Sequence, residues 1–286
     1  MTSAFFKIFS PIIFLFFPAH AIVTESPTIS IFPPSVIQGE PLEIVIQNAT
    51  SSQVKNISFN GKNLGVFAYQ NKSTAFVGVD INQKPLTYVV SATLSDDTTL
   101  TKYVMVGARQ KIETAFSIPA SLGGNSTSSA VSLVNTLAEE NAELLKLVIN
   151  PKNLWTNKFI YPLSQITVTD GYGYSRQTSG VSITHKGTDF RASTGTSVMT
   201  MNRGIVRLAK KFTEYGNTIV IDHGLGLMTF YMHLSKINVN VGELVNQGQI
   251  IGLSGDTGDA LAPHLHVSVR INNISIDPIK FMALFK

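Results

Sequence analysis

Short runs of β-prone residues, separated by turn residues, cover the chain from residue 22 to residue 107. The runs recur at intervals of about ten residues, a spacing typical of small β-sandwiches. They occupy residues 42–47, 54–59, 64–69, 74–79, 86–92 and 100–106. No cluster of candidate metal ligands or nucleophiles lies among them. The pattern predicts an immunoglobulin-like β-sandwich over residues 22–108, whose role is to position, dock or block another part of the chain.

The hydrophobic period changes between residues 126 and 149. Apolar or small positions there lie three or four residues apart for the most part, namely Val131, Val134, Leu137, Ala138, Asn141, Leu145 and Val148. This spacing predicts one face of an amphipathic α-helix, which Pro151 would end. Glu139, Glu140 and Glu143 fall in the same stretch. We interpret these three glutamates as a solvated helix face and the whole segment, 109–154, as a linker.

Glycine-punctuated strands return in the last part of the chain, from Trp155 onward. The expected strands are 204–208, 218–222, 228–232, 250–253 and 264–271. Five of the six histidines fall in this part. The chain is therefore expected to be mainly β, with a second β-rich domain over residues 155–286 that carries the chemistry.

The first 21 residues have the pattern of a targeting segment. Lys7 precedes a short apolar run that ends in Ala19-His20-Ala21. A basic residue, an apolar run and small residues at this spacing predict a secretory signal that is cleaved after Ala21. The apolar run is about ten residues long, whereas a spanning helix needs roughly 20. We therefore expect an exported chain with no membrane span after cleavage.

Composition narrows the class of protein further. Hydrophobic residues make up 44% and charged residues 14% of the 286 positions, which excludes a disordered chain. The net charge of +4 comes without a dense stripe of Lys and Arg, which argues against a nucleic-acid partner. The chain has no cysteine and so no disulfide. Export without disulfides fits a bacterial periplasmic or cell-envelope protein.

Histidines and one aspartate form the candidate chemical site. His185 and Asp189 lie four residues apart and would share one face of a strand. His264 and His266 would share a face in the same way, with the residue between them in the core. His233 lies near the end of an expected strand. Imidazole and carboxylate groups are good zinc ligands, so the spacing by itself predicts a metal site.

Many short motifs in residues 159–281 occur in the order found in one known family. They are Tyr172-Gly173-Tyr174-Ser175-Arg176, His185-Lys186-Gly187-Thr188-Asp189-Phe190, Gly195-Thr196-Ser197-Val198, Tyr215-Gly216-Asn217, Ile221-Asp222-His223-Gly224, Tyr231-Met232-His233-Leu234-Ser235, Val241-Gly242-Glu243, Gly248-Gln249-Ile250-Ile251-Gly252, Gly255-Asp256-Thr257-Gly258, Pro263-His264-Leu265-His266 and Asp277-Pro278. This segment resembles the lysostaphin/LytM-type peptidoglycan endopeptidases. The sandwich and helix in front resemble the amino-terminal region of some exported members.

The resemblance implies an antiparallel β-sheet metallopeptidase domain that binds one zinc ion per chain and acts on peptidoglycan. By position, the family's zinc ligands fall on His185, Asp189 and His266. Its two further catalytic histidines fall on His233 and His264, one to hold or deprotonate the water and one to stabilise the oxyanion. Which of the two does which stays open.

Two stretches depart from the family's pattern. Residues 259–262 replace the small residues and glycine that often precede Pro-His-Leu-His, and residues 267–269 replace an aromatic-acidic run. Both leave the ligands intact and bear on the wall of the substrate groove. Of the remaining polar residues, His223 is expected to be structural, and Asp222 and Arg176 are candidates for contacts to the ligands or the substrate.

Three functions remain open at this stage. The leading hypothesis is a zinc endopeptidase that cuts peptide cross-links of peptidoglycan. A zinc amidase or carboxypeptidase acting on the same polymer is the first alternative, and a non-catalytic activator of other cell-wall hydrolases is the second. A wall hydrolase needs restraint, so we also hypothesise that the sandwich and its helix cover the groove and regulate it.

Overall fold

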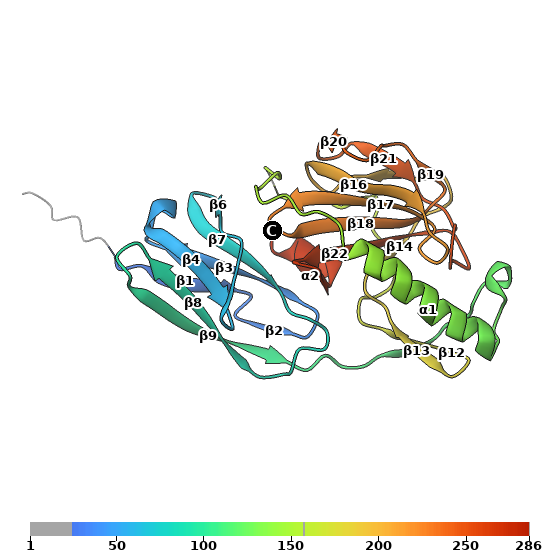
Figure 1. Cartoon of the computed structure of the whole chain (residues 1–286), viewed down its shortest axis with the longest axis horizontal. Coiled ribbons are helices and arrows are strands. Elements are labelled where there is room, and N and C mark those ends of the chain that lie inside the picture. The colour runs from blue at the N-terminus through green and yellow to red at the C-terminus, as the bar shows by residue number, and fades with distance from the viewer. Residues whose placement is uncertain (1–24, 157, 286) are drawn as a thin grey trace, which may run out of the picture.

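The computed structural model describes residues 25–156 and 158–285, which form two β-rich units joined by a long segment that contains helix α1 (Figure 1). The expected signal sequence, residues 1–21, lies outside the described residues. Among the described residues, no helix has the length and apolar character needed to cross a bilayer. The molecule is mainly β, as the sequence predicts.

The amino-terminal unit packs two sheets face to face. One sheet has the strand order β1-β3-β7-β6, with β1 Thr28–Phe32, β3 Pro41–Gln47, β6 Phe67–Tyr69 and β7 Lys72–Gly78. The other has the order β2-β9-β8-β4-β5, with β2 Ser35–Ile37, β4 Val54–Phe59, β5 Lys62–Asn63, β8 Thr87–Leu94 and β9 Thr99–Gly107. Burial alternates along β8, so every second side chain enters the core between the sheets. All six expected runs contain strands, and the short strands β1, β2 and β5 are additional.

The segment after the sandwich is packed onto the second unit. Its strand β10 (Glu113–Ala115) pairs in parallel with β12 (Ser175–Thr178), and β12 pairs with β13 (Val181–Thr184). Helix α1 (Thr127–Leu144) follows, with the Ser126 hydroxyl accepting a hydrogen bond from the Ser129 backbone N–H as its N-cap. The segment expected to be a linker therefore shares a sheet with the domain that it leads to.

Helix α1 ends five residues before the predicted end at residue 149. Leu147 and Ile149 leave the helix and pack against a buried cluster that includes Phe230 and Val220. The backbone N–H of Asn150 then donates to the Asp222 carboxylate. These contacts with the sheet end the helix, and Pro151 does not.

The buried face of α1 also differs from the predicted one. The helix buries a stripe made of Ala130, Leu133, Glu140 and Leu144. The predicted face is offset from this stripe, and its members Val131, Val134, Leu145 and Val148 are exposed. The interpretation of all three glutamates as solvated is wrong for Glu140, which is buried because backbone N–H groups of the loop between β16 and β17 bind its carboxylate.

The second unit is built on an antiparallel sheet with the order β11-β14-β22-β18-β17-β16-β20, and β23 pairs with β22. Its strands are β11 Val168–Asp170, β14 Thr188–Arg191, β16 Gly204–Lys211, β17 Asn217–Gly224, β18 Leu227–Leu234, β20 Leu244–Val245, β22 His264–Ile271 and β23 Ile274–Ile276. A smaller sheet contains β15 (Ser197–Met199), β21 (Ile250–Leu253) and β19 (Lys236–Ile237). Helix α2 (Pro278–Ala283) closes the chain, with Asp277 as its N-cap.

The two units share an aromatic core. Phe76 of β7 stacks on Trp155, with ring centroids 5.9 Å apart, and it also contacts Phe281 and Phe285 near the end of the chain. Gly78 packs on Ile276 of β23, where an added Cβ would lie only 3.0 Å from the isoleucine side chain. The sandwich is therefore fixed against α2 and the edge of the large sheet. Helix α1 lies along the neighbouring face of the second unit (Figure 1).

Candidate metal centre

Two neighbouring strands and the loop before them bring His185, Asp189 and His266 together. Asp189 of β14 and His266 of β22 are direct cross-strand partners. The Nδ1 atom of His266 lies 2.7 Å from Asp189 Oδ1 and 3.0 Å from His185 Nε2. His185 Nε2 is in turn 3.2 Å from Asp189 Oδ1. Two donor atoms from residues four apart and a third from His266, remote in the chain, thus form one small triangle.

His185 reaches this triangle by a different route from the one predicted. It lies between β13 and β14, so it does not share a strand face with Asp189. The intervening turn passes directly over the His266 ring. A Cβ on Gly187 would collide with that ring and with the Val267 carbonyl, so only glycine fits there.

Hydrogen bonds hold the candidate ligands in place. His185 donates from Nδ1 to the Gly171 carbonyl over 2.8 Å, which leaves its Nε2 lone pair facing the triangle. Arg176 of β12 forms ion pairs with both Asp189 and Asp170. The structure thus places Arg176 beside a candidate ligand, as expected for a residue that orients it.

The donor set fits a metal ion. Tetrahedral bonds of about 2.0–2.1 Å to zinc imply donor atoms roughly 3.3 Å apart, close to the separations in the triangle. Burial lowers the pKa of His266 to about 4, so its imidazole is neutral and free to ligate at neutral pH. Burial alone would raise the pKa of Asp189, but His185 and His266 hold it well below its usual range. These three residues could therefore hold an ion between them.

His233 and His264 flank the triangle on its open side. Their ring centroids are 4.8 Å apart, and the Nε2 atom of His264 lies 3.8 Å from Asp189 Oδ1. Each donates from Nδ1 to a nearby carbonyl, His233 to Thr257 and His264 to Ala262, which leaves Nε2 as an acceptor. The backbone of His233 has a left-handed φ of 59°, a strained conformation of the kind found at functional sites.

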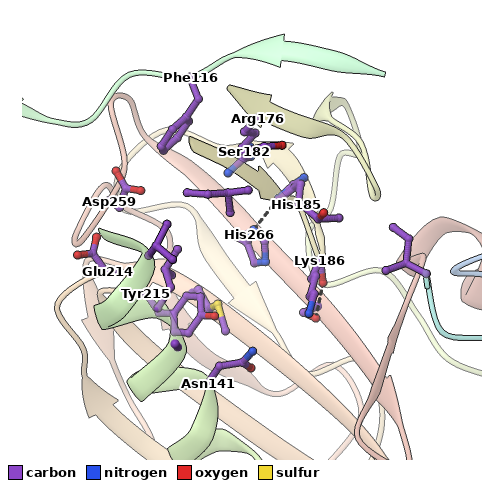
Figure 2. A pocket seen from close by; sticks show the side chains of 18 of the residues that line it. Phe116, Asn141, Arg176, Ser182, His185, Lys186, Glu214, Tyr215, Asp259 and His266 are labelled. Carbon is purple, nitrogen blue, oxygen red and sulfur yellow. Dashed lines mark hydrogen bonds between the residues drawn. The ribbon is translucent and has the colours of Figure 1, made fainter. Parts of the chain in front are cut away.

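A cavity of 380 Å³ lies beside the triangle, between α1 and the sheet. Figure 2 shows its lining, with Glu214 and Asp259 at one end and His185 and His266 further along. Burial, together with Asp259 and Glu140, raises the pKa of Glu214 to about 7. The cavity thus joins the candidate metal site to the face of the helix.

Sequence reasoning placed some polar residues correctly and overlooked others. His223 is fully buried and hydrogen-bonded to the Arg203 carbonyl and the Thr229 hydroxyl, which is a structural position. Asp222 pairs with Arg207 and caps backbone N–H groups, so it contacts none of the candidate ligands. Glu140, which is predicted to be solvated, is buried. Arg270 lines the cavity, although a single arginine late in a strand carries no sequence signal.

Residues 183–278, which carry this site, match the model of peptidase family M23. Over 96 residues the chain is 44% identical to the peptidoglycan DD-endopeptidase ShyA of Vibrio cholerae, and this match covers 34% of this chain and 22% of that protein. Over 119 residues it is 41% identical to lysostaphin of Staphylococcus simulans, and this match covers 39% of this chain and 24% of lysostaphin. The chain thus spans about a quarter of the length of these curated relatives.

The arrangement of both units recurs in a solved structure. A crystal structure from Pseudomonas aeruginosa that is assigned to peptidase M23 matches with a TM-score of 0.63. The match covers 87% of this chain and 96% of that chain at 22% identity. The shared fold therefore includes the sandwich as well as the large sheet.

Proposed function

We propose that the protein is a zinc-dependent endopeptidase that hydrolyses peptide cross-links of bacterial peptidoglycan through a metal-activated water. The observation that carries this proposal is the triangle of His185, Asp189 and His266 inside an M23 domain. The names of the relatives support the substrate, since ShyA is a peptidoglycan DD-endopeptidase. One zinc per chain satisfies the three protein donors and leaves a position for water.

The hydrogen bonds of the site residues indicate the role that we propose for each. A zinc ion held by the three ligands supplies a Lewis acid that lowers the pKa of bound water to about 7 and polarises the scissile carbonyl. His233 and His264 each bind a backbone carbonyl through Nδ1, so each Nε2 would be free to exchange a proton with water or substrate at the site or to stabilise the oxyanion. Arg176 orients Asp189.

The location of the substrate supports export. Peptidoglycan lies outside the cytoplasmic membrane, and residues 1–21 have the pattern of a cleaved secretory signal. We therefore propose that the mature protein works in the periplasm or cell envelope, with no nucleic-acid partner. The proposed domains are the sandwich at 22–108, the helix-bearing segment at 109–154 and the peptidase at 155–286.

Wall digestion with product analysis tests the proposal. Purified peptidoglycan is incubated with zinc-loaded protein, with chelator-treated protein and with chelator-treated protein to which zinc is restored. Endopeptidase activity requires that cross-linked fragments fall to uncross-linked ones in a zinc-dependent way. Release of intact stem peptides from glycan would indicate an amidase, loss of single terminal residues a carboxypeptidase, and no release a non-catalytic activator.

We also propose that the amino-terminal half restrains the enzyme. The structure supports a role for α1 in particular, since Val134, Leu137 and Asn141 line the cavity beside the candidate metal site. The sandwich packs against β22, β23 and α2, and its residues Ile81 and Asn82 also line the cavity, so it would anchor the cover and border the groove. Substrate access then requires α1 to move away from the sheet.

A further inference from the structure

Arg270 is a buried cation without a buried anion. It lies on β22, four residues beyond His266 and therefore on the same face of the strand, and only 4% of it is exposed. It forms no ion pair with any carboxylate among the described residues. Its Nε and Nη1 atoms have no hydrogen-bond partner, although both are buried. Such donors are costly unless something binds them.

A second set of donors lies in the loop between β16 and β17. The backbone N–H groups of three consecutive residues, Thr213, Glu214 and Tyr215, all point at one carboxylate, that of Glu140. The first two bind Oε1 over 2.6 and 3.0 Å, and the third binds Oε2 over 3.1 Å. Consecutive N–H groups that converge in this way form a site for an anion.

Arg270 and two of the three loop residues, Glu214 and Tyr215, line the same cavity as the candidate metal site. Arg270 and Tyr215 border it together with His233 and His266. Burial raises the pKa of the Tyr215 phenol to about 12, and the positive charge of Arg270 acts in the opposite direction. The loop is tied to the site as well, since Tyr215 accepts a hydrogen bond at its carbonyl from the His233 backbone.

Helix α1 places an oxygen against each set of donors, from two adjacent residues. Glu140 supplies its carboxylate to the loop, and Asn141 supplies Oδ1 to Nη2 of Arg270 over 2.6 Å. A helix that only packed on the sheet would present apolar side chains here. Instead it presents a carboxylate and an amide oxygen, the groups that a peptide with a free carboxylate would bring.

We propose that Arg270 and the N–H groups of residues 213–215 form a carboxylate-binding subsite of the substrate groove, which Glu140 and Asn141 occupy while α1 is closed. The inference rests on the proposed function for its substrate, a peptide with a free carboxylate. When α1 moves, the substrate carboxylate binds between the loop N–H groups and Arg270, which Glu140 and Asn141 contact separately in the closed form. Arg270 then gains a partner for its unbonded nitrogens.

The nearby acidic residues are compatible with an anion there. Burial and the charges of Asp259 and Glu140 raise the pKa of Glu214 to about 7. Burial raises the pKa of Asp259 to about 6. Both shifts favour the neutral carboxyl, so at pH 6 these two residues oppose a bound carboxylate less than two full charges would.

An NMR titration of the full-length, zinc-loaded protein at pH 6 tests this subsite. The probes are N-acetyl-D-alanine, which carries a carboxylate, and N-acetyl-D-alaninamide, which does not. The proteins are wild type, Glu140→Ala and the double variant Glu140→Ala with Arg270→Gln, and Glu143→Ala is the matched control, because Glu143 is exposed and pairs with Lys210. The readout is the backbone amide signals of residues 213–215.

The expected result is a saturable shift of these three signals by the carboxylate probe in Glu140→Ala. Its affinity should be at least about tenfold higher than in wild type or Glu143→Ala, and it should fall again in the double variant. Equal binding of the amide probe, equal binding of inorganic phosphate, or no shift at residues 213–215 would overturn the subsite. If Glu140→Ala does not give a dispersed spectrum, Glu140→Gln, which keeps the shape of the side chain, replaces it with the same expectations.

The titration also separates this inference from the proposed function. It reads binding and involves no hydrolysis, while zinc content and wall digestion are measured on the same preparations. A protein that digests wall but shows no carboxylate shift refutes the subsite alone. A protein that shows the shift but cuts no cross-link refutes the proposed function alone.

Discussion

Glu140 of α1 and His233 at the end of β18 are both hydrogen-bonded to the backbone of Tyr215. The Tyr215 N–H donates to Glu140 Oε2, and the Tyr215 carbonyl accepts from the His233 N–H. Helix α1, which lines the cavity, is therefore hydrogen-bonded to the same peptide segment as a candidate catalytic histidine. Any movement of the helix acts next to the site.

Weakening the hydrogen bonds between Glu140 and the loop at residues 213–215 should speed wall digestion. Glu140→Gln removes the charge from three hydrogen bonds, and charged bonds are stronger than neutral ones, so the open form should gain on the order of tenfold in population. We expect peptidoglycan turbidity to fall faster by a similar factor. Glu143→Gln is the control, since Glu143 is exposed and pairs only with Lys210. Equal rates for both variants would argue against α1 as a cover.

Two histidines of β22 should separate metal binding from catalysis. His266 points its Nδ1 atom into the ligand triangle, whereas His264 lies two residues away with its Nε2 atom 3.8 Å from Asp189. His266→Ala should lose bound zinc and all activity. His264→Ala should keep zinc and lose activity by about 10²–10⁴-fold, the range typical of an acid-base residue. Metal analysis and wall digestion of both variants check this, and loss of zinc from His264→Ala would contradict the assignment.

Arg176 should affect the metal without touching it. Its ion pair with Asp189 fixes the carboxylate that faces the two histidine ligands. Arg176→Gln should therefore weaken zinc binding by about 10- to 100-fold, as is typical when a residue that orients a ligand is lost. Competition with a zinc-binding dye measures the change. Arg191→Gln, at an exposed position on the same strand as Asp189, should bind zinc like the wild type.

The residues of the candidate metal site were more predictable from the sequence than the packing of helix α1. His185, Asp189 and His266 stand in short motifs whose residue types already suggest metal ligation. The burial of Glu140 could not be predicted, because the groups that neutralise it are backbone N–H groups over 70 residues away, and such donors are the same in every sequence. The end of α1 depended in the same way on contacts with Val220 and Phe230 that are remote in the chain.

Strand β10 was missed by the sequence prediction for a related reason. The runs at 54–59, 250–253 and 264–271 match β4, β21 and β22 because the β-prone residues of each run already indicate a strand. Strand β10 has an exposed Glu113 and Ala115 and lies in the sheet only because β12 provides a partner. Short edge strands of this kind are defined by a distant partner, so their own residues carry little signal.

Acid should destabilise the metal-free protein through His223. Burial lowers its pKa to about 4 from an ordinary value of 6.5, so between these pH values the unfolded state binds more protons than the folded state. The stability present above pH 6.5 should therefore fall by about 3 kcal/mol as the pH drops to 4. Urea unfolding of the chelator-treated protein and of His223→Gln at pH 7 and pH 4.5 isolates this effect. A wild type that loses no more stability than the variant would contradict it.

The most direct test of the central claim is the digestion of purified peptidoglycan by wild type and by His185→Ala, with the products identified by mass. His185 supplies one of the three donor atoms of the candidate metal site, and its other nitrogen is bound to the Gly171 carbonyl. The account predicts that wild type converts cross-linked muropeptides to uncross-linked ones and that His185→Ala leaves them intact. Equal conversion by the two proteins would contradict the assignment of the metal site.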